Sequence, residues 1–134
     1  MSDWYCDQVL SGERRIDVVV ETDAVLAFHH TRPAYDDAHI VVIPKLHVPS
    51  LLSEELTDAL LLEMLAVVRT LASRVVREKG ACRVVTNLGQ YQDSQHLHWH
   101  VVSGERIAEP VEVPLPPTAR RYAVAARTRF ANPS

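Results

Sequence analysis

The sequence predicts a single domain of the α+β class, and three observations lead to this prediction. Five short segments are rich in strand-forming residues, one long segment carries an apolar stripe at helical spacing, and the length of 134 residues suits one domain. Apolar residues make up 47% of the chain and charged residues 23%, which is typical of a globular protein with its own core.

Five segments are expected to form strands, three before the long helix and two after it. Residues 15–21 (RIDVVVE) and 24–29 (AVLAFH) flank a short turn at Thr22 and Asp23. Residues 38–43 (AHIVVI) are β-branched and stop at Pro44, which cannot donate to a sheet. Residues 82–86 (CRVVT) and 95–103 (QHLHWHVVS) complete the set, the last with strict alternation at its start.

One long helix is expected between the third and fourth strands. Ser53 suits the N-cap, and the acidic Glu54 and Glu55 after it suit the positive end of the helix dipole. Lys79 and Gly80 provide a basic last turn and a left-handed C-terminal cap. A second, short helix is expected at 6–11. The apolar stripe of the long helix consists of Leu56, Leu60, Met64, Val67, Leu71 and Val75.

Charge and composition narrow the class of partner and the compartment. The formal net charge of −3 gives no basic excess for nucleic acid, so we expect no nucleic-acid partner. Charged residues interrupt the apolar region 51–76, which argues against a membrane span. The N-terminus has no signal-peptide pattern, and Cys6 and Cys82 form no disulfide framework. A cytoplasmic protein without a membrane partner is expected.

Three histidines, His96, His98 and His100, alternate with the apolar residues Leu97, Trp99 and Val101. On a strand, this alternation places three imidazoles on one face and apolar residues on the other. Three interpretations compete. The row is a solvated strand face, or a zinc site, or a site for phosphoryl chemistry in which one imidazole attacks phosphorus and its neighbours assist.

The string HLHWHVV resembles the signature of the histidine triad (HIT) family, and the resemblance extends beyond it. Asn87 precedes the triad within VVTNLG. The upstream segment AFHHTRPAYDDAHIVVIPKLHVPSL contains His39, an Ile-Pro-Lys turn and His47, and SGERRIDVVVETDAVLAF is similar to the family's opening strands. The resemblance covers residues 11–104. We therefore expect a HIT domain at 1–104 and a C-terminal extension, rich in proline and arginine, at 105–134.

The resemblance implies a HIT-like fold and a reaction class. The fold is a five-stranded antiparallel sheet with one long and one short helix, pairing into a homodimer. The implied enzyme is a phosphoramidase, nucleotide hydrolase or nucleotidyl transferase that acts at an α-phosphate through a nucleotidyl-histidine intermediate. The implied substrate is a purine nucleotide with a phosphoramidate, acyl or phosphoanhydride link, and the mechanism needs neither a metal nor a cofactor.

The resemblance also assigns roles to the histidines. His98, the central member, is the expected nucleophile, and its second ring nitrogen is expected to donate to a main-chain carbonyl near His100. His100 is expected to contact the phosphate or the leaving group. His96 and His39 are expected to support and orient the other two.

Substrate contacts are expected from the loop before the triad and from the second strand. Asn87 and Gln92 correspond to polar residues of the family. Hint-type members have an aspartate that binds the ribose after a Phe-His pair, whereas here Phe28 and His29 are followed by His30. Asp93 stands where serine or threonine is common, so either Asp93 faces a cationic leaving group or Ser94 takes the hydroxyl role.

The resemblance also bears on a zinc site that some HIT proteins have. Some HIT proteins hold zinc near the N-terminus with two cysteines, and here only Cys6 is present, so that site is expected to be lost.

Two alternative functions remain open. The first is a nucleotide-binding interaction module with little turnover. The second is a metal-dependent enzyme that uses the triad as ligands.

Overall fold

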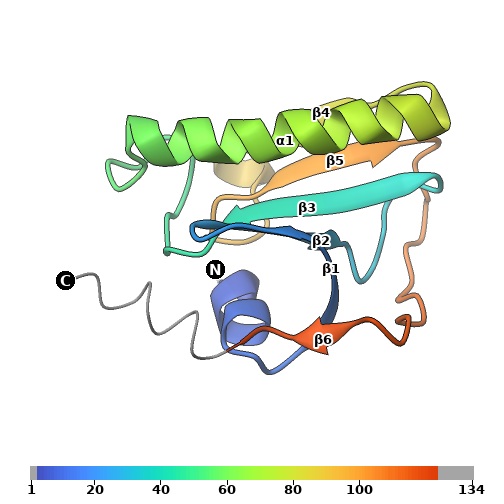
Figure 1. The fold of residues 1–134 in the computed structure, drawn as a ribbon, viewed down its shortest axis with the longest axis horizontal. Helices are drawn as coiled ribbons and strands as arrows, with labels where there is room; N and C mark the ends of the chain where they lie inside the picture. Colours follow the sequence, from blue (N-terminus) through green and yellow to red (C-terminus); the bar gives the residue numbers. More distant parts are fainter. Residues whose placement is uncertain (1–2, 124–134) are drawn as a thin grey trace.

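The computed structural model describes residues 3–123 and shows an antiparallel sheet between a long helix and a short one (Figure 1). The strand order is β4-β5-β3-β2-β1-β6, and α1 covers one face of the sheet while η1 lies on the other. The predicted α+β class is confirmed. The elements in chain order are η1 (Tyr5–Leu10), β1 (Arg15–Glu21), β2 (Val25–His29), β3 (Ala38–Pro44), α1 (Asp58–Lys79), β4 (Arg83–Thr86), η2 (Gly89–Tyr91), β5 (Trp99–Ser103) and β6 (Arg120–Arg121).

The sheet has six strands, so the prediction of five was wrong. The additional strand, β6, pairs antiparallel with the start of β1, where Arg121 lies opposite Arg15 and Arg120 opposite Ile16. A strand of two residues is too short to show an alternating pattern in the sequence. Contacts with residues far away along the chain hold β6 in place. The Arg120 guanidinium donates to the Glu21 carboxylate at 2.6 Å. The tail was expected to be a short helix or flexible, and residues 124–134 lie outside the described part.

The sheet separates two apolar clusters because neighbouring side chains on a strand point to opposite faces. On β2, Ala27 packs into the cluster under α1, whereas Phe28 packs into the cluster beside η1. Phe28 was expected to contact substrate, but its side chain is 0% exposed, and its ring packs against Tyr5 with the centroids 6.2 Å apart. Phe28 is therefore a core residue.

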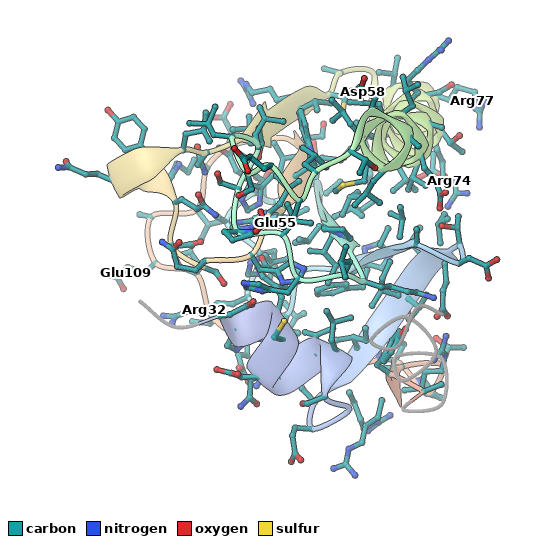
Figure 2. The ribbon with its side chains drawn as sticks, turned by 90° about the vertical axis from the view of Figure 1, so that its left-hand side faces the viewer. Arg32, Glu55, Asp58, Arg74, Arg77 and Glu109 are labelled. Atoms are coloured by element: carbon teal, nitrogen blue, oxygen red, sulfur yellow. The ribbon has the colours of Figure 1, made fainter. Side chains whose placement is uncertain are left out.

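The helix α1 has the predicted apolar stripe and the predicted C-terminus, but it begins later than expected. Its N-cap is Thr57, whose side chain accepts from the Leu60 amide at 3.2 Å, and not Ser53. Ser53 instead closes a preceding turn by accepting from the Ser50 amide at 3.0 Å. Gly80 ends the helix with φ of 88°. Figure 2 looks along α1 and shows the labelled Asp58, Arg74 and Arg77 at its periphery.

The last long strand, β5, is shorter than predicted and begins at Trp99. The Leu97 amide donates to the Val48 carbonyl at 2.7 Å, so the segment before β5 is bonded to a loop and not to a neighbouring strand. His96 and His98 therefore precede the strand, and only His100 lies on it, opposite Val41 of β3. The expected regular strand face is thus replaced by a bend that carries two of the three imidazoles.

The described part of the C-terminal extension returns to the body of the domain. The Ile107 amide donates to Ala34 at 2.8 Å, and the Val113 amide donates to Thr31 at 3.2 Å. The division of the chain at residue 104 stays a prediction. Among residues 3–123, no helix is both long and apolar enough to cross a membrane.

Candidate active site

The three triad histidines and His39 meet on the face of the sheet that carries η1. His39 comes from β3 and His100 from the adjacent β5, while His96 and His98 come from the bend before β5. The rings of His98 and His100 lie 4.9 Å apart, and those of His39 and His100 lie 5.0 Å apart. The local fold therefore gathers the rings of His39, His98 and His100, with His96 on the same bend as His98.

His98 is held in one orientation by main-chain oxygen. Its Nδ1–H donates to the His96 carbonyl at 2.7 Å, so the acceptor is not the expected carbonyl near His100. The bend before β5 brings the carbonyl two residues back onto the ring. The Tyr5 ring lies 4.8 Å from the His98 ring, and the residue is only 2% exposed. In the neutral ring Nε2 therefore carries the lone pair, and this atom has no hydrogen-bond partner among the described residues.

A backbone amide sets the tautomers of His39 and His100. The Ala34 amide donates to Nδ1 of His39 at 2.9 Å, so Nε2 of His39 carries the proton. That Nε2–H donates to Nδ1 of His100 at 2.8 Å. Nδ1 of His100 is consequently an acceptor, and its Nε2–H is left to donate to a bound anion.

Burial keeps both of these rings neutral. Desolvation, together with the neighbouring His30 and His100, lowers the pKa of His39 to about 3. Desolvation, together with the neighbouring His98 and His30, lowers the pKa of His100 to about 4. Near pH 7, His100 thus acts as a neutral N–H donor and not as an imidazolium.

His30 lies where a ribose-binding carboxylate was expected. Its Nδ1 accepts from the Arg32 amide at 2.9 Å, and its ring stacks on His39 with the centroids 4.4 Å apart. Burial lowers the pKa of His30 as well. The ring therefore offers a bound ligand one Nε2–H and an aromatic edge, and it cannot accept two hydroxyl hydrogen bonds as a carboxylate does.

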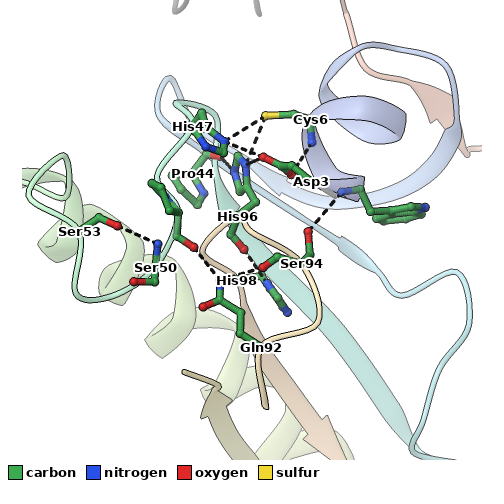
Figure 3. Close-up of polar contacts among 12 residues, drawn as sticks. Asp3, Cys6, Pro44, His47, Ser50, Ser53, Gln92, Ser94, His96 and His98 are labelled. Carbon is green, nitrogen blue, oxygen red and sulfur yellow. Dashed lines mark hydrogen bonds and ion pairs between the residues drawn. The ribbon is translucent and has the colours of Figure 1, made fainter. Parts of the chain in front are cut away.

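The loop before the triad brings Asp93 to His98. The Gln92 side chain is buried and donates to the carbonyls of Pro49 and Ser94 at 2.6 and 2.8 Å, so it shapes the loop (Figure 3). The Ser94 hydroxyl accepts from the Trp4 amide at 3.2 Å. Oδ1 of Asp93 lies 3.3 Å from Nε2 of His98, but the two atoms are outside hydrogen-bond geometry. The neighbouring His98 lowers the pKa of this carboxyl, although partial burial opposes the shift.

Asn87 directly follows β4. The hydroxyl of its neighbour Thr86 donates to the His98 carbonyl at 2.9 Å, so the end of β4 is bonded to the backbone of His98. The structure thus places Asn87 at the triad end of β4, and its expected contact with substrate stays a prediction.

Two cavities lie beside the site, and His30 lines both of them. The larger, of about 420 Å³, is lined by Tyr5, His30, Arg32, Asp93 and Ser94 among others. The smaller, of about 290 Å³, also includes His30, together with His39. The two cavities meet at the His30 side chain, and a ligand in the larger one lies between η1 and the triad loop.

A second cluster lies behind the triad and includes one of its members. Nδ1 of His96 lies 3.0 Å from the Asp3 carboxylate and 3.4 Å from the Cys6 sulfur, and Nδ1 of His47 lies 2.6 Å from the same carboxylate (Figure 3). One ligand atom from each of these four residues lies within 4.8 Å of the others. Carboxylate, thiolate and imidazole are the ligands of zinc, so these residues fit the metal of some HIT proteins.

Counting cysteines could not reveal this cluster, because a carboxylate stands where the second thiolate was sought. The spacing Asp3-x-x-Cys6 was the available signal. His47 is part of the same cluster, because its ring shares the Asp3 carboxylate with His96.

Comparison with known proteins agrees with this geometry. The family model described as HIT domain matches residues 11–107. An uncharacterized HIT-like protein of Synechococcus elongatus is 34% identical over 106 residues, which cover 77% of this chain and 91% of that protein. A HIT family hydrolase from Legionella pneumophila aligns with a TM-score of 0.65 and 27% identity, covering 78% of this chain and 95% of that one. A histidine triad protein from Clostridium difficile aligns with a TM-score of 0.59 and 29% identity, covering 80% and 94%.

Proposed function

The chain belongs to the HIT domain family, and from that premise we propose that it is a nucleotide hydrolase or nucleotidyl transferase with His98 as its nucleophile. One observation carries the proposal. The His96 carbonyl fixes Nδ1–H of His98 at 2.7 Å, which leaves the buried Nε2 lone pair beside Asp93 and the larger cavity. A fixed, unprotonated imidazole nitrogen is what attack on phosphorus requires.

The proposed first step forms a bond between Nε2 of His98 and an α-phosphorus. The bond from phosphorus to the leaving group breaks, and the leaving group departs with the bonding electron pair and takes one proton from solvent. The ring then carries a positive charge, and the hydrogen bond from Nδ1–H to the His96 carbonyl stabilises this charge. In the second step, water or another acceptor attacks phosphorus and releases His98.

The neutral His100 is proposed to stabilise the phosphate during both steps. Its Nδ1 is occupied by His39, so its Nε2–H is the group that donates to a phosphate oxygen. Such a donor needs no change of protonation state near pH 7, because burial keeps the pKa of His100 at about 4. Thr86 and the His96 carbonyl hold the nucleophile in place from the other side.

The direct test follows release of the nucleoside monophosphate from adenosine 5′-phosphoramidate and related substrates. We expect wild-type turnover and a loss of at least about a thousandfold in His98→Ala. Glu55→Gln is the control, because Glu55 is exposed and lines neither cavity. Equal activity of His98→Ala and the wild type would contradict the proposal.

The second candidate function is a nucleotide-binding module with little turnover. The carboxylate of Asp93, 3.3 Å from the attacking nitrogen, favours this reading because it repels an approaching phosphate. Saturable nucleotide binding by calorimetry, with no hydrolysis across phosphoramidates, acyl-nucleotides and dinucleoside polyphosphates, would support it. Turnover of any of these substrates would exclude it.

A cytoplasmic homodimer is the proposed form of the protein. β4 ends the sheet, and its edge carries the exposed Val84. Leu62 and Val76 of the neighbouring α1 and Leu88 after β4 are also exposed. An unpaired edge next to apolar side chains suits pairing with a second copy, by which the two sheets join.

A further inference from the structure

We infer that Asp3, Cys6, His47 and His96 bind one divalent transition-metal ion of the zinc type, with the carboxylate of Asp3 in place of a second thiolate. The four side chains come from the N-terminus, from η1, from the turn after β3 and from the triad segment. Four of the six separations between their ligand atoms run from 2.6 to 3.6 Å, and all six are within 4.8 Å. Ligand atoms about 2.0–2.3 Å from one tetrahedral ion lie at roughly such spacings.

The hydrogen-bond contacts of His96 point to a cation at this position. Its Nε2–H donates to the Pro44 carbonyl at 2.8 Å, which is the supporting contact typical of metal-bound imidazoles. In the neutral ring, Nδ1 then directs a lone pair at the Asp3 carboxylate, 3.0 Å away. Two acceptors face each other, and a metal ion or an extra proton relieves this contact. The thiol of Cys6 and the ring of His47 complete a four-donor set, which favours the metal.

The position of this site ties it to the nucleophile. His96 supplies the metal-facing Nδ1 through its side chain, and its main-chain carbonyl accepts from Nδ1–H of His98 at 2.7 Å. The side chain of His96 is completely buried. An ion bound to it anchors the bend that places His98.

The test is metal binding by untagged protein, first stripped with chelator. We expect one equivalent of Zn²⁺ by calorimetry, a rise in melting temperature, and a thiolate-to-cobalt charge-transfer band when Co²⁺ is used. Asp3→Asn and His47→Gln should each weaken binding at least about tenfold. Cys6→Ser should lose the charge-transfer band, whereas Cys82→Ser, the matched cysteine control, should keep it.

Two results would overturn the metal site. The first is the absence of saturable Zn²⁺ binding by the wild type. The second is equal affinity and an equal cobalt spectrum in Cys6→Ser and the wild type. Because the side chain of His47 is half exposed, His47→Gln is the variant least prone to misfolding, and its circular dichroism spectrum provides the folding control.

We propose, as a second inference that rests on the proposed function, that Asp93 directs the enzyme to substrates with an amine leaving group. Asp93 Oδ1 lies 3.3 Å from the attacking Nε2, so the carboxylate stays beside any phosphate bound there. A carboxylate accepts hydrogen bonds from an amine and is attracted by an ammonium group, but it repels a leaving phosphate. Because the Asp93 side chain is 85% exposed and an ordinary aspartate has a pKa of about 3.9, the carboxyl is ionised near pH 7.

In the proposed reaction, the phosphorus–nitrogen bond of a nucleoside phosphoramidate breaks as the bond to His98 Nε2 forms. The amine leaves with the electron pair of that bond and one proton from solvent, and Asp93 accepts an N–H of the departing group. Water then attacks phosphorus, so that each cycle consumes one water and yields one amine and one nucleoside monophosphate.

The test compares kcat/KM for an adenosine phosphoramidate that carries an aminoalkyl group with kcat/KM for diadenosine tetraphosphate. We expect the ratio to fall about fivefold in Asp93→Asn and Asp93→Ser, the size of one solvent-screened charge contact. The Asp93 side chain is 85% exposed, so both variants should fold. Glu55→Gln removes an exposed carboxylate that lines neither cavity and should keep the ratio.

An unchanged ratio in both Asp93 variants, with wild-type turnover intact, would overturn the role of Asp93 and leave the proposed function standing. Equal activity of the wild type and His98→Ala would instead remove the proposed function. Calorimetric affinities for a non-hydrolysable amine analogue and for a polyphosphate analogue give a second readout that does not require turnover. Equal changes of both affinities in Asp93→Asn would also overturn the role.

Discussion

His39 and His100 make the stability of the domain depend on pH. Their folded-state pKa values, about 3 and about 4, lie below the ordinary value for histidine. The unfolded chain therefore binds more protons below about pH 6.5, and the free energy of unfolding falls as the pH falls. The stabilisation is complete above pH 6.5 and is lost progressively as the pH approaches the folded-state values.

The expected loss is on the order of 2 kcal/mol between pH 7 and pH 5, after allowance for partial solvent screening. Urea titrations across that range measure it. His100→Asn should flatten the curve, and the exposed His29→Gln should not. Constant stability of the wild type between pH 7 and pH 5 would contradict the inferred neutrality of the two buried rings.

His30 predicts weak discrimination of the ribose. Its Nδ1 already accepts from the Arg32 amide, so only its Nε2–H is left for a sugar hydroxyl. We expect similar kcat/KM values for ribonucleotide and 2′-deoxyribonucleotide substrates. His30→Asp should raise the ratio of the two by about tenfold, the effect of one hydrogen bond to a charged acceptor. A strong preference of the wild type for the ribonucleotide would show that another group reads the sugar.

At the scale of elements, Thr57 provides a direct test of where α1 begins. Thr57→Ala removes the side chain that accepts from the Leu60 amide, and it should lower the free energy of unfolding by about 1 kcal/mol. Ser53→Ala, at the cap expected from the sequence, removes only a turn contact and should cost less. Chemical denaturation of both variants measures the difference, and the reverse order would place the helix start at Ser53.

The sequence predicted those elements whose pattern spans several residues. The alternation in β2 and β3, the stripe of α1 and the left-handed Gly80 are local signals that packing preserved. The start of β5 was misplaced because the bond from Leu97 to Val48 depends on a distant loop. No local signal marks where a strand yields to such a contact.

The candidate site also has a part that the sequence predicts from local spacing and a part that depends on contacts between distant segments. Spacing placed His98 and His100 together, and the family resemblance added His39 to them. The strand pattern of residues 95–103 did not reveal the bend that brings the His96 carbonyl to His98. Asp3 was not predicted because its contact with His96, 93 residues later, forms only in the folded chain.

At the scale of the whole molecule, the two edges of the sheet differ. β6 pairs with part of β1 at one end, and at the other end no further strand of residues 3–123 pairs with β4. We expect a dimer by analytical ultracentrifugation. Val84→Lys, which places a charge on the open edge, should shift the equilibrium toward monomer. A wild-type monomer at high micromolar concentration would refute pairing through this edge.

The sheet also stands as a partition between the apolar cluster under α1 and the smaller one beside η1. The histidine rings of the candidate site lie on the η1 side, where the covering helix has six residues. Gentle heating should therefore abolish turnover while the circular dichroism of α1 is still intact. A melting curve taken from residual activity would report the detachment of η1, not the collapse of the domain.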